Sequence, residues 1–99
     1  MVFRIKNHTQ GRERVVAACD EELLGKKLAE GRLRLHVNPD FYDGFEGDEA
    51  ALEQFLRRST VANLVGKRTV ELAIKLGFVA PENVLTIEGV PHAQWALML

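Results

Sequence analysis

Alternation of apolar and basic residues along positions 2–6 is the feature that most constrains the fold of this chain. A period of two is typical of a half-buried strand, with apolar side chains on one face and polar side chains on the other. Turn-forming residues follow at 7–11, and residues 13–19 form a second extended run. The pattern therefore predicts an N-terminal β-hairpin.

The next part of the chain combines a helix signal with a strand signal. Asp20 is a good N-cap, and it predicts a helical region that either extends toward Gly31 or ends after one turn at Gly25. Apolar and polar residues then alternate along 33–37, up to the dipeptide Asn38-Pro39. We therefore expect a third strand at 33–37.

Two helices are expected in the middle of the chain. Asp48 is an N-cap for a helix whose last turn contains Arg57 and Arg58, where cations suit the negative end of the dipole. Ser59 or Thr60 is expected to cap another helix that runs to Gly77. The two helices would form a corner or a helical hairpin.

The C-terminal region is expected to hold two strands, at 85–88 and 93–99, with a bend at 89–91 between them. The full order predicts an α+β fold in a single domain spanning 1–99. Its core would be a mainly antiparallel sheet of about five strands, with two to three helices packed on one face. A chain of 99 residues is long enough to bury such a core.

Cysteine content and hydropathy indicate a cytoplasmic protein. Cys19 is the single cysteine, so no intramolecular disulfide can form and a reducing compartment fits best. No apolar run is long enough to cross a membrane, and the start of the chain lacks the apolar stretch of a signal peptide.

Charge is unevenly distributed, although the formal net charge is only -1. Residues 1–34 carry eight Lys or Arg against five Asp or Glu, residues 35–56 carry six acids and no base, and residues 57–99 carry five bases against three acids. The acidic middle could therefore present a separate face to a partner, or it could fold against the basic flanks.

The segment from Thr60 to Gly77, read as a helix, would place small residues in one strip. Ala62, Gly66 and Ala73 belong to this strip. Since a glycine inside a helix costs about 1 kcal/mol relative to alanine, close approach of another backbone is the expected compensation.

A neighbouring polar strip of the same predicted helix carries Asn63 and Lys67, with Arg68 beside it. These side chains could hold a phosphate or a carboxylate. The alternative interpretation is an ordinary solvated helix face.

The bend before the last predicted strand directs a second group of polar residues. Pro91 fixes φ and Gly89 can adopt a positive φ, so the bend would aim His92, with Gln94 on the same side. An imidazole next to an amide can bind an anion, a base edge or a carbonyl. Alternatively, His92 simply hydrogen-bonds a backbone group at the turn.

Catalytic, cofactor and metal signals are weak. Cys19 at a helix start could be a nucleophile with His92 as base, but the three acids that follow it disfavour a thiolate, and a buried inert cysteine is the preferred interpretation. The sequence lacks a phosphate loop, a dinucleotide fingerprint and paired metal-ligand spacings. We therefore expect no cofactor and no metal.

Several segments together resemble an archaeal family catalogued as domain of unknown function 424. The resemblance implies a small cytoplasmic protein without an established activity, loosely associated with archaeal translation genes. The segments that carry it are Cys19-Asp20-Glu21-Glu22-Leu23-Leu24-Gly25-Lys26, Phe41-Tyr42, Asn63-Leu64-Val65-Gly66 and Gly89-Val90-Pro91-His92-Ala93-Gln94.

The leading hypothesis is a non-enzymatic module that binds RNA, a ribonucleoprotein or another translation component. The sequence pI of about 6.3 is lower than that of a dedicated nucleic-acid binder, so modest affinity is expected. Asn63, His92 and Gln94 would lie near the bound RNA. The residues expected to contact phosphates are Arg4, Lys6, Arg12, Arg14, Lys26, Lys27, Lys67 and Arg68.

Two alternatives remain from the sequence. A protein-interaction or homodimerising subunit would use the apolar tail 95–99 or the acidic and aromatic segment 41–48. A small enzyme would use His92 together with Cys19 or Asn63, which requires these side chains to lie within hydrogen-bond reach.

Overall fold

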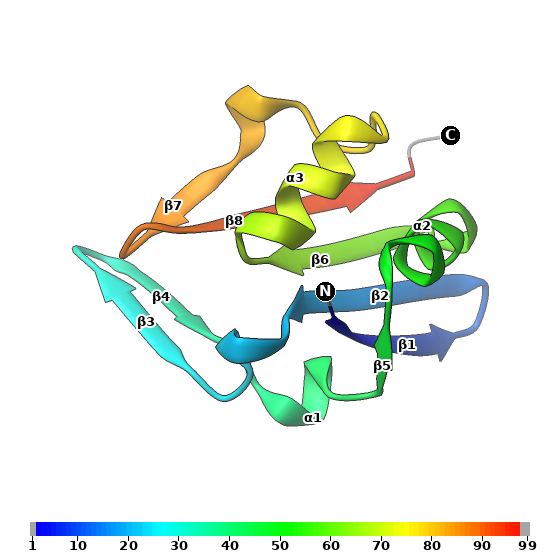
Figure 1. The fold of residues 1–99 in the computed structure, drawn as a ribbon, viewed down its shortest axis with the longest axis horizontal. Coiled ribbons are helices and arrows are strands. Elements are labelled where there is room, and N and C mark those ends of the chain that lie inside the picture. The colour runs from blue at the N-terminus through cyan, green and yellow to red at the C-terminus, as the bar shows by residue number, and fades with distance from the viewer. Residues whose placement is uncertain (1, 98–99) are drawn as a thin grey trace.

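A computed structural model describes residues 2–97 of the chain. The predicted α+β class is confirmed (Figure 1). Within the described residues there are eight strands: β1 (Phe3–Gln10), β2 (Glu13–Asp20), β3 (Lys27–Glu30), β4 (Leu33–His36), β5 (Phe45–Gly47), β6 (Val61–Val65), β7 (Leu85–Ile87) and β8 (Val90–Ala96). The helices are α1 (Pro39–Tyr42), α2 (Glu49–Arg58) and α3 (Lys67–Lys75), and single 3-10 turns span Glu21–Leu23 and Pro81–Asn83. None of these helices is long and apolar enough to cross a membrane.

Six strands form the main sheet, in the order β5-β1-β2-β6-β8-β7. The predicted N-terminal hairpin is confirmed, because β1 and β2 are antiparallel with Phe3 opposite Asp20. The sheet is antiparallel throughout except where β2 and β6 run parallel. The carboxyl ends of the two central strands, β2 and β6, therefore lie side by side.

The long helix predicted from Thr60 to Gly77 is wrong in its first third. Residues Val61–Val65 form the central strand β6, and α3 begins only at Lys67. Gly66 separates the two elements with a φ of 111°, which interrupts a right-handed helix. Ala62 thus lies on a strand rather than in the predicted helical strip of small residues.

The first predicted helical region is a single 3-10 turn, the shorter of the two expected outcomes. Gly25 ends it with a φ of 86° and donates its N–H to the carbonyl of Val37 at 2.7 Å. The chain then forms the separate two-stranded β3–β4 ribbon, and the strand expected at 33–37 is confirmed as β4.

Both faces of the sheet bury apolar residues. On one face, α2 and α3 cover Ile5 and Leu64 of the sheet, and Leu52 of α2 packs into the same larger core. On the other face, Val37 and Tyr42 pack against Cys19 in a smaller core. The predicted arrangement of helices on one face thus holds for α2 and α3, while α1 belongs to the opposite face.

Helix α2 and the last strand were predicted more accurately. Asp48 caps α2, as expected, by accepting the N–H of Ala51 at 2.9 Å. The last strand is β8, which begins three residues before the predicted start, and it lies between β6 and β7. Residues 98 and 99, which the sequence assigned to this strand, lie outside the described residues.

Candidate functional site

An amide pair lies on the sheet face opposite α2 and α3. Asn63 of β6 and Gln94 of β8 are cross-strand partners, and Gln94 Nε2 donates to Asn63 Oδ1 at 2.8 Å. Asn63 is half-buried and Gln94 is exposed. The bond uses one donor and one acceptor, so each amide keeps further hydrogen-bonding capacity for a ligand.

His92 lies on the same side as Gln94, as alternation along β8 predicts. Its Nδ1 is 3.0 Å from the carbonyl oxygen of Leu64. Because a carbonyl oxygen only accepts, Nδ1 is assigned as the donor, and in the neutral ring Nε2 is then an acceptor. Beside His92 is a pocket of about 270 Å³ whose lining residues are Asn83, Leu85, His92, Ala93 and Gln94.

The β3–β4 ribbon has one apolar face and one basic face. Cross-strand pairing places Leu28 with Leu35 on one face, and Leu35 packs against the smaller core. The opposite face carries Lys27 paired with His36, and Arg34 paired with Ala29. Four exposed cations thus surround this ribbon: Lys26, Lys27, Arg32 and Arg34.

The tip of the ribbon is attached to the β7–β8 turn by two glutamates. Glu30 Oε1 accepts the N–H of Glu88 at 2.7 Å, and Glu88 Oε2 accepts the N–H of Ala29 at 2.7 Å. Figure 1 shows the two hairpins meeting at their tips. We call this reciprocal contact the glutamate clasp, and it holds the basic ribbon in a defined orientation.

The segment that follows β6 does not offer the anion site suggested by its sequence. Asp20, at the end of the parallel strand β2, occupies the N-terminus of α3 and accepts the N–H groups of Arg68 at 3.1 Å and Thr69 at 2.9 Å. A Cβ on Gly66 would overlap the Asp20 carboxyl group. The protein's own carboxylate therefore fills the position that a bound anion would take.

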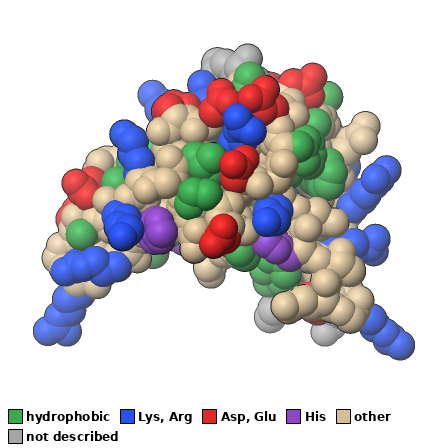
Figure 2. All heavy atoms as spheres, turned by 90° about the horizontal axis from the view of Figure 1, so that it is seen from below, with side chains coloured by type: hydrophobic (Ala, Val, Ile, Leu, Met, Phe, Trp, Pro, Cys, Tyr) green, Lys and Arg blue, Asp and Glu red, His purple; other side chains and the backbone are tan. Residues whose placement is uncertain are grey.

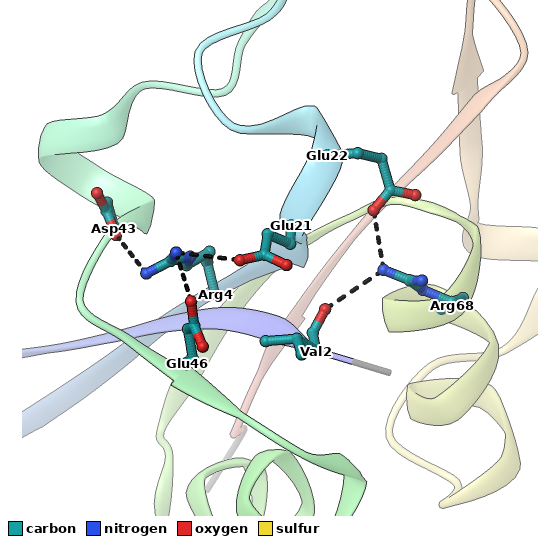
Figure 3. A network of polar contacts seen from close by, with 7 residues as sticks. All are labelled: Val2, Arg4, Glu21, Glu22, Asp43, Glu46 and Arg68. Atoms are coloured by element: carbon teal, nitrogen blue, oxygen red, sulfur yellow. Dashed lines mark hydrogen bonds and ion pairs between the residues drawn. The ribbon is translucent and has the colours of Figure 1, made fainter.

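Arg68 is held by internal contacts. Its Nη2 lies 2.9 Å from Glu22 Oε1 and 3.3 Å from the carbonyl oxygen of Val2 (Figure 3). The predicted strip of Asn63 with Lys67 and Arg68 is wrong, because Asn63 faces the other side of the sheet from α3. The structure therefore groups Asn63 with His92 and Gln94, and it places Lys67 and Arg68 elsewhere.

The acidic middle of the chain folds against the basic N-terminal strand, one of the two outcomes expected from the charge pattern. Arg4 forms ion pairs with Glu21 at 3.0 Å, Asp43 at 3.3 Å and Glu46 at 2.8 Å (Figure 3). Lys6 Nζ donates to the carbonyl oxygen of Asp40 at 2.8 Å. Both cations, predicted to contact phosphates, thus have internal partners.

The aromatic residues of the same segment also pack internally. The ring of Phe41 stacks on His8 with 4.7 Å between centroids, and Tyr42 is buried. Phe45 packs against Phe55 with 5.1 Å between ring centroids but stays 38% exposed, so it is the aromatic side chain of this segment that a docking partner could still reach.

Cys19 is fully buried, as the preferred interpretation of the sequence expects. Burial, together with the neighbouring Asp20 carboxylate, raises the pKa of its thiol from 9.0 to about 12. One strand separates Cys19 from His92 in the sheet, so their Cα atoms are about 10 Å apart by strand spacing. This geometry gives no support to catalysis by the pair. Groups of metal-ligating residues are likewise absent from the described part of the chain.

A family model described as "Protein of unknown function (DUF424)" matches residues 8–98. The chain belongs to the DUF424 family. This confirms the resemblance seen in the sequence. The fold is also similar to the crystal structure of an uncharacterized conserved protein from Methanopyrus kandleri, with a TM-score of 0.76 and 22% identity over 100% of this chain and 96% of that chain. No curated protein matches the chain.

Two features of this DUF424 protein were missed by sequence reasoning. Arg32 and Arg34 were not among the predicted contact residues, although the alternation along 33–37 could have placed Arg34 on the polar face of that strand. The contact between Asp20 and α3 had no local signal, since its partners are 48 and 49 positions away.

Proposed function

We propose that this DUF424 protein is a non-enzymatic cytoplasmic module that binds RNA, including RNA within a ribonucleoprotein. The observation that carries the proposal is the basic β3–β4 ribbon. Its four cations are exposed, and within residues 2–97 none of them forms an ion pair with a carboxylate. Cations whose charge is not neutralised by a carboxylate can neutralise phosphates and release counterions.

The direction of the ribbon supports the same proposal. Its leucine face packs toward the smaller core, so Lys27 and Arg34 project away from the sheet. Arg34 Nη1 also donates to the carbonyl oxygens of Gly31 at 2.8 Å and Leu33 at 2.9 Å, which fixes the guanidinium over the ribbon turn. A fixed cation loses less conformational entropy on binding than a mobile one.

A second group of cations lies at the other hairpin. Arg12 and Arg14 are exposed at the β1–β2 turn. Figure 2 shows basic side chains extending from both ends of the molecule, with the outline hollowed between them. An RNA strand that spans this distance can contact cations at both ends.

The amide pair and His92 supply groups of a different kind. Asn63, Gln94 and His92 can donate to and accept from base edges or ribose hydroxyls, whereas the ribbon cations contact the backbone. In this proposal the ribbon cations supply the affinity. The sheet face that carries the amide pair and His92 supplies the contacts to bases or sugars.

The test compares RNA binding by two double variants that remove equal charge. Lys26→Ala with Lys27→Ala removes two cations at the ribbon, whereas Arg58→Ala with Lys75→Ala removes two exposed cations of α2 and α3. Fluorescence anisotropy with a labelled single-stranded RNA gives the affinity at several salt concentrations. If each ribbon lysine contacts one phosphate, the ribbon variant lowers the slope of log K against log salt by about 1.4, and the helix variant leaves it unchanged.

Two results would contradict the proposal. One is the absence of RNA binding by the wild-type protein at low salt. The other is equal weakening by the two variants, because the response would then follow net charge and not the ribbon.

A further inference from the structure

The outer edge of β8 is only partly covered by β7. Strand β8 has seven residues, whereas β7 has three, which pair with Val90, Pro91 and His92. Within the described residues, no strand lies beside β8 beyond His92 on this side. The second half of β8 is therefore an open sheet edge.

The alternation of hydrogen-bonded positions along β8 shows which backbone groups face this edge. Gly66 donates its N–H to the carbonyl of Pro91 at 2.8 Å, and Leu97 donates to the carbonyl of Thr60 at 2.8 Å. In an antiparallel ladder the hydrogen-bonded positions alternate, so the odd-numbered residues of β8 point their backbone groups toward β6. Gln94 and Ala96 consequently direct their N–H and C=O groups to the open edge, and both residues are exposed.

The chemistry of this edge lacks the usual protection against strand pairing. Residues 93–97 contain no charge and no proline. Leu85 is 52% exposed at the start of β7, and Leu97 is 50% exposed after the end of β8. Exposed edges normally carry charged residues, prolines or bulges that prevent another strand from adding.

We propose that this edge pairs with the same edge of a second copy of the chain, through antiparallel β8 strands. A twofold axis at Trp95 places Gln94 opposite Ala96 of the second copy and Ala96 opposite its Gln94. The two outward donors and two outward acceptors of each copy then all find partners. The pairing stops at His92, because the backbone of His92 already pairs with Leu85 of β7.

A second copy suits this edge because the edge is complementary to itself. It offers two N–H and two C=O groups in a pattern that a twofold rotation matches, and it brings no like charges together. Trp95 packs edge-on against Phe78, with 5.2 Å between ring centroids, on the helix-covered side. The proposed register places the indole rings of the two copies side by side across the axis.

The dimer is tested by a charge swap that depends on the register. Gln94→Lys with Ala96→Lys brings two pairs of ammonium groups together across the axis. Gln94→Lys with Ala96→Glu instead brings each ammonium group next to a carboxylate of the other copy. Sedimentation equilibrium over a concentration series gives the dissociation constant, and thermal unfolding of each variant verifies that the subunit is intact.

The wild-type protein is expected to reach twice the mass of one chain as concentration rises. The double-lysine variant should weaken the dimer by about tenfold or more, and the lysine–glutamate variant should restore it, since like charges directly opposite destabilise a strand pair. Because the chain has one tryptophan, its emission should shift with the same concentration dependence. A wild-type protein that stays monomeric, or a dimer that the double-lysine variant leaves intact, overturns the proposal.

Discussion

Asp20 and Thr69 are joined by two hydrogen bonds, although 49 positions separate them in the sequence. Asp20 Oδ1 accepts both the backbone N–H of Thr69 at 2.9 Å and its hydroxyl at 2.8 Å. Both residues are buried. The carboxylate thus caps α3 from another strand and fixes the start of the helix to the end of β2.

Replacing this carboxylate should cost a large part of the stability. In Asp20→Ala, the N–H groups of Arg68 and Thr69 and the hydroxyl of Thr69 lose their acceptor, and we expect a loss of roughly 2–4 kcal/mol in the free energy of unfolding. Asp20→Asn keeps one carbonyl acceptor and should lose less. Urea unfolding of the two variants measures both values, and a loss below about 1 kcal/mol for Asp20→Ala would refute the capping role.

Gly66→Ala should be more harmful than Gly77→Ala, although both positions have positive φ, at 111° and 85°. At Gly66 a Cβ would lie 2.7 Å from Asp20 Oδ1, whereas no described atom lies within 4 Å at Gly77. The Gly77 variant therefore measures the cost of a positive φ in open space, about 1 kcal/mol, and the Gly66 variant adds both a backbone conformation at ψ 153° that side chains rarely adopt and displacement of the cap. Equal destabilisation of the two variants would show that the cap tolerates the added methyl group.

The glutamate clasp should control the motion of the basic ribbon. In Glu88→Ala the N–H of Ala29 loses its acceptor, so its hydrogen exchange should accelerate by about tenfold or more as the ribbon tip opens. Glu82→Ala is the matched control, because Glu82 is an exposed glutamate at the other end of β7 that makes no hydrogen bond with the described residues. Unchanged exchange at Ala29 in the Glu88 variant would mean that ribbon contacts other than the clasp hold the tip.

Alkaline pH should weaken the fold through Cys19 and Tyr42. Burial raises the pKa of the Cys19 thiol from 9.0 to about 12 and that of the Tyr42 phenol from 10.0 to about 12. The folded protein therefore keeps protons that the unfolded chain releases, so stability is full below pH 9 and falls as the pH rises toward 12. Urea midpoints between pH 8 and pH 11 measure the slope, and Cys19→Ala should flatten its lower part; an identical slope in that variant would contradict the assignment.

Local patterns were sufficient to predict the β1–β2 hairpin and helix α2. Strand β1 starts with alternating apolar and basic residues, turn residues separate it from β2, and α2 has a capping Asp48 and basic residues in its last turn. Strand β6 was missed because a short apolar run preceding a glycine fits either a buried strand or a helix. The choice is made at Gly66, where a positive φ and the absence of a Cβ leave room for the carboxyl group of Asp20 from another strand.

The candidate site was predictable only where one strand carries it. His92 and Gln94 share a face because they are two positions apart on β8. Their proximity to Asn63 depends on β6 lying next to β8, which no local signal contains. The internal roles of Arg4 and Arg68 were also missed, since their acidic partners are 17 to 46 positions away.

The carboxylate at the start of α3 also decides what this helix N-terminus can hold. A strand followed by a glycine and then by a helix is a common setting for an anion taken from solution at the helix N-terminus. Here the anion is a permanent part of the polypeptide, delivered by Asp20 when β2 and β6 come together. An external phosphate therefore cannot bind at this terminus. The N–H groups at the start of α3 instead tie the helix to the first hairpin through Asp20.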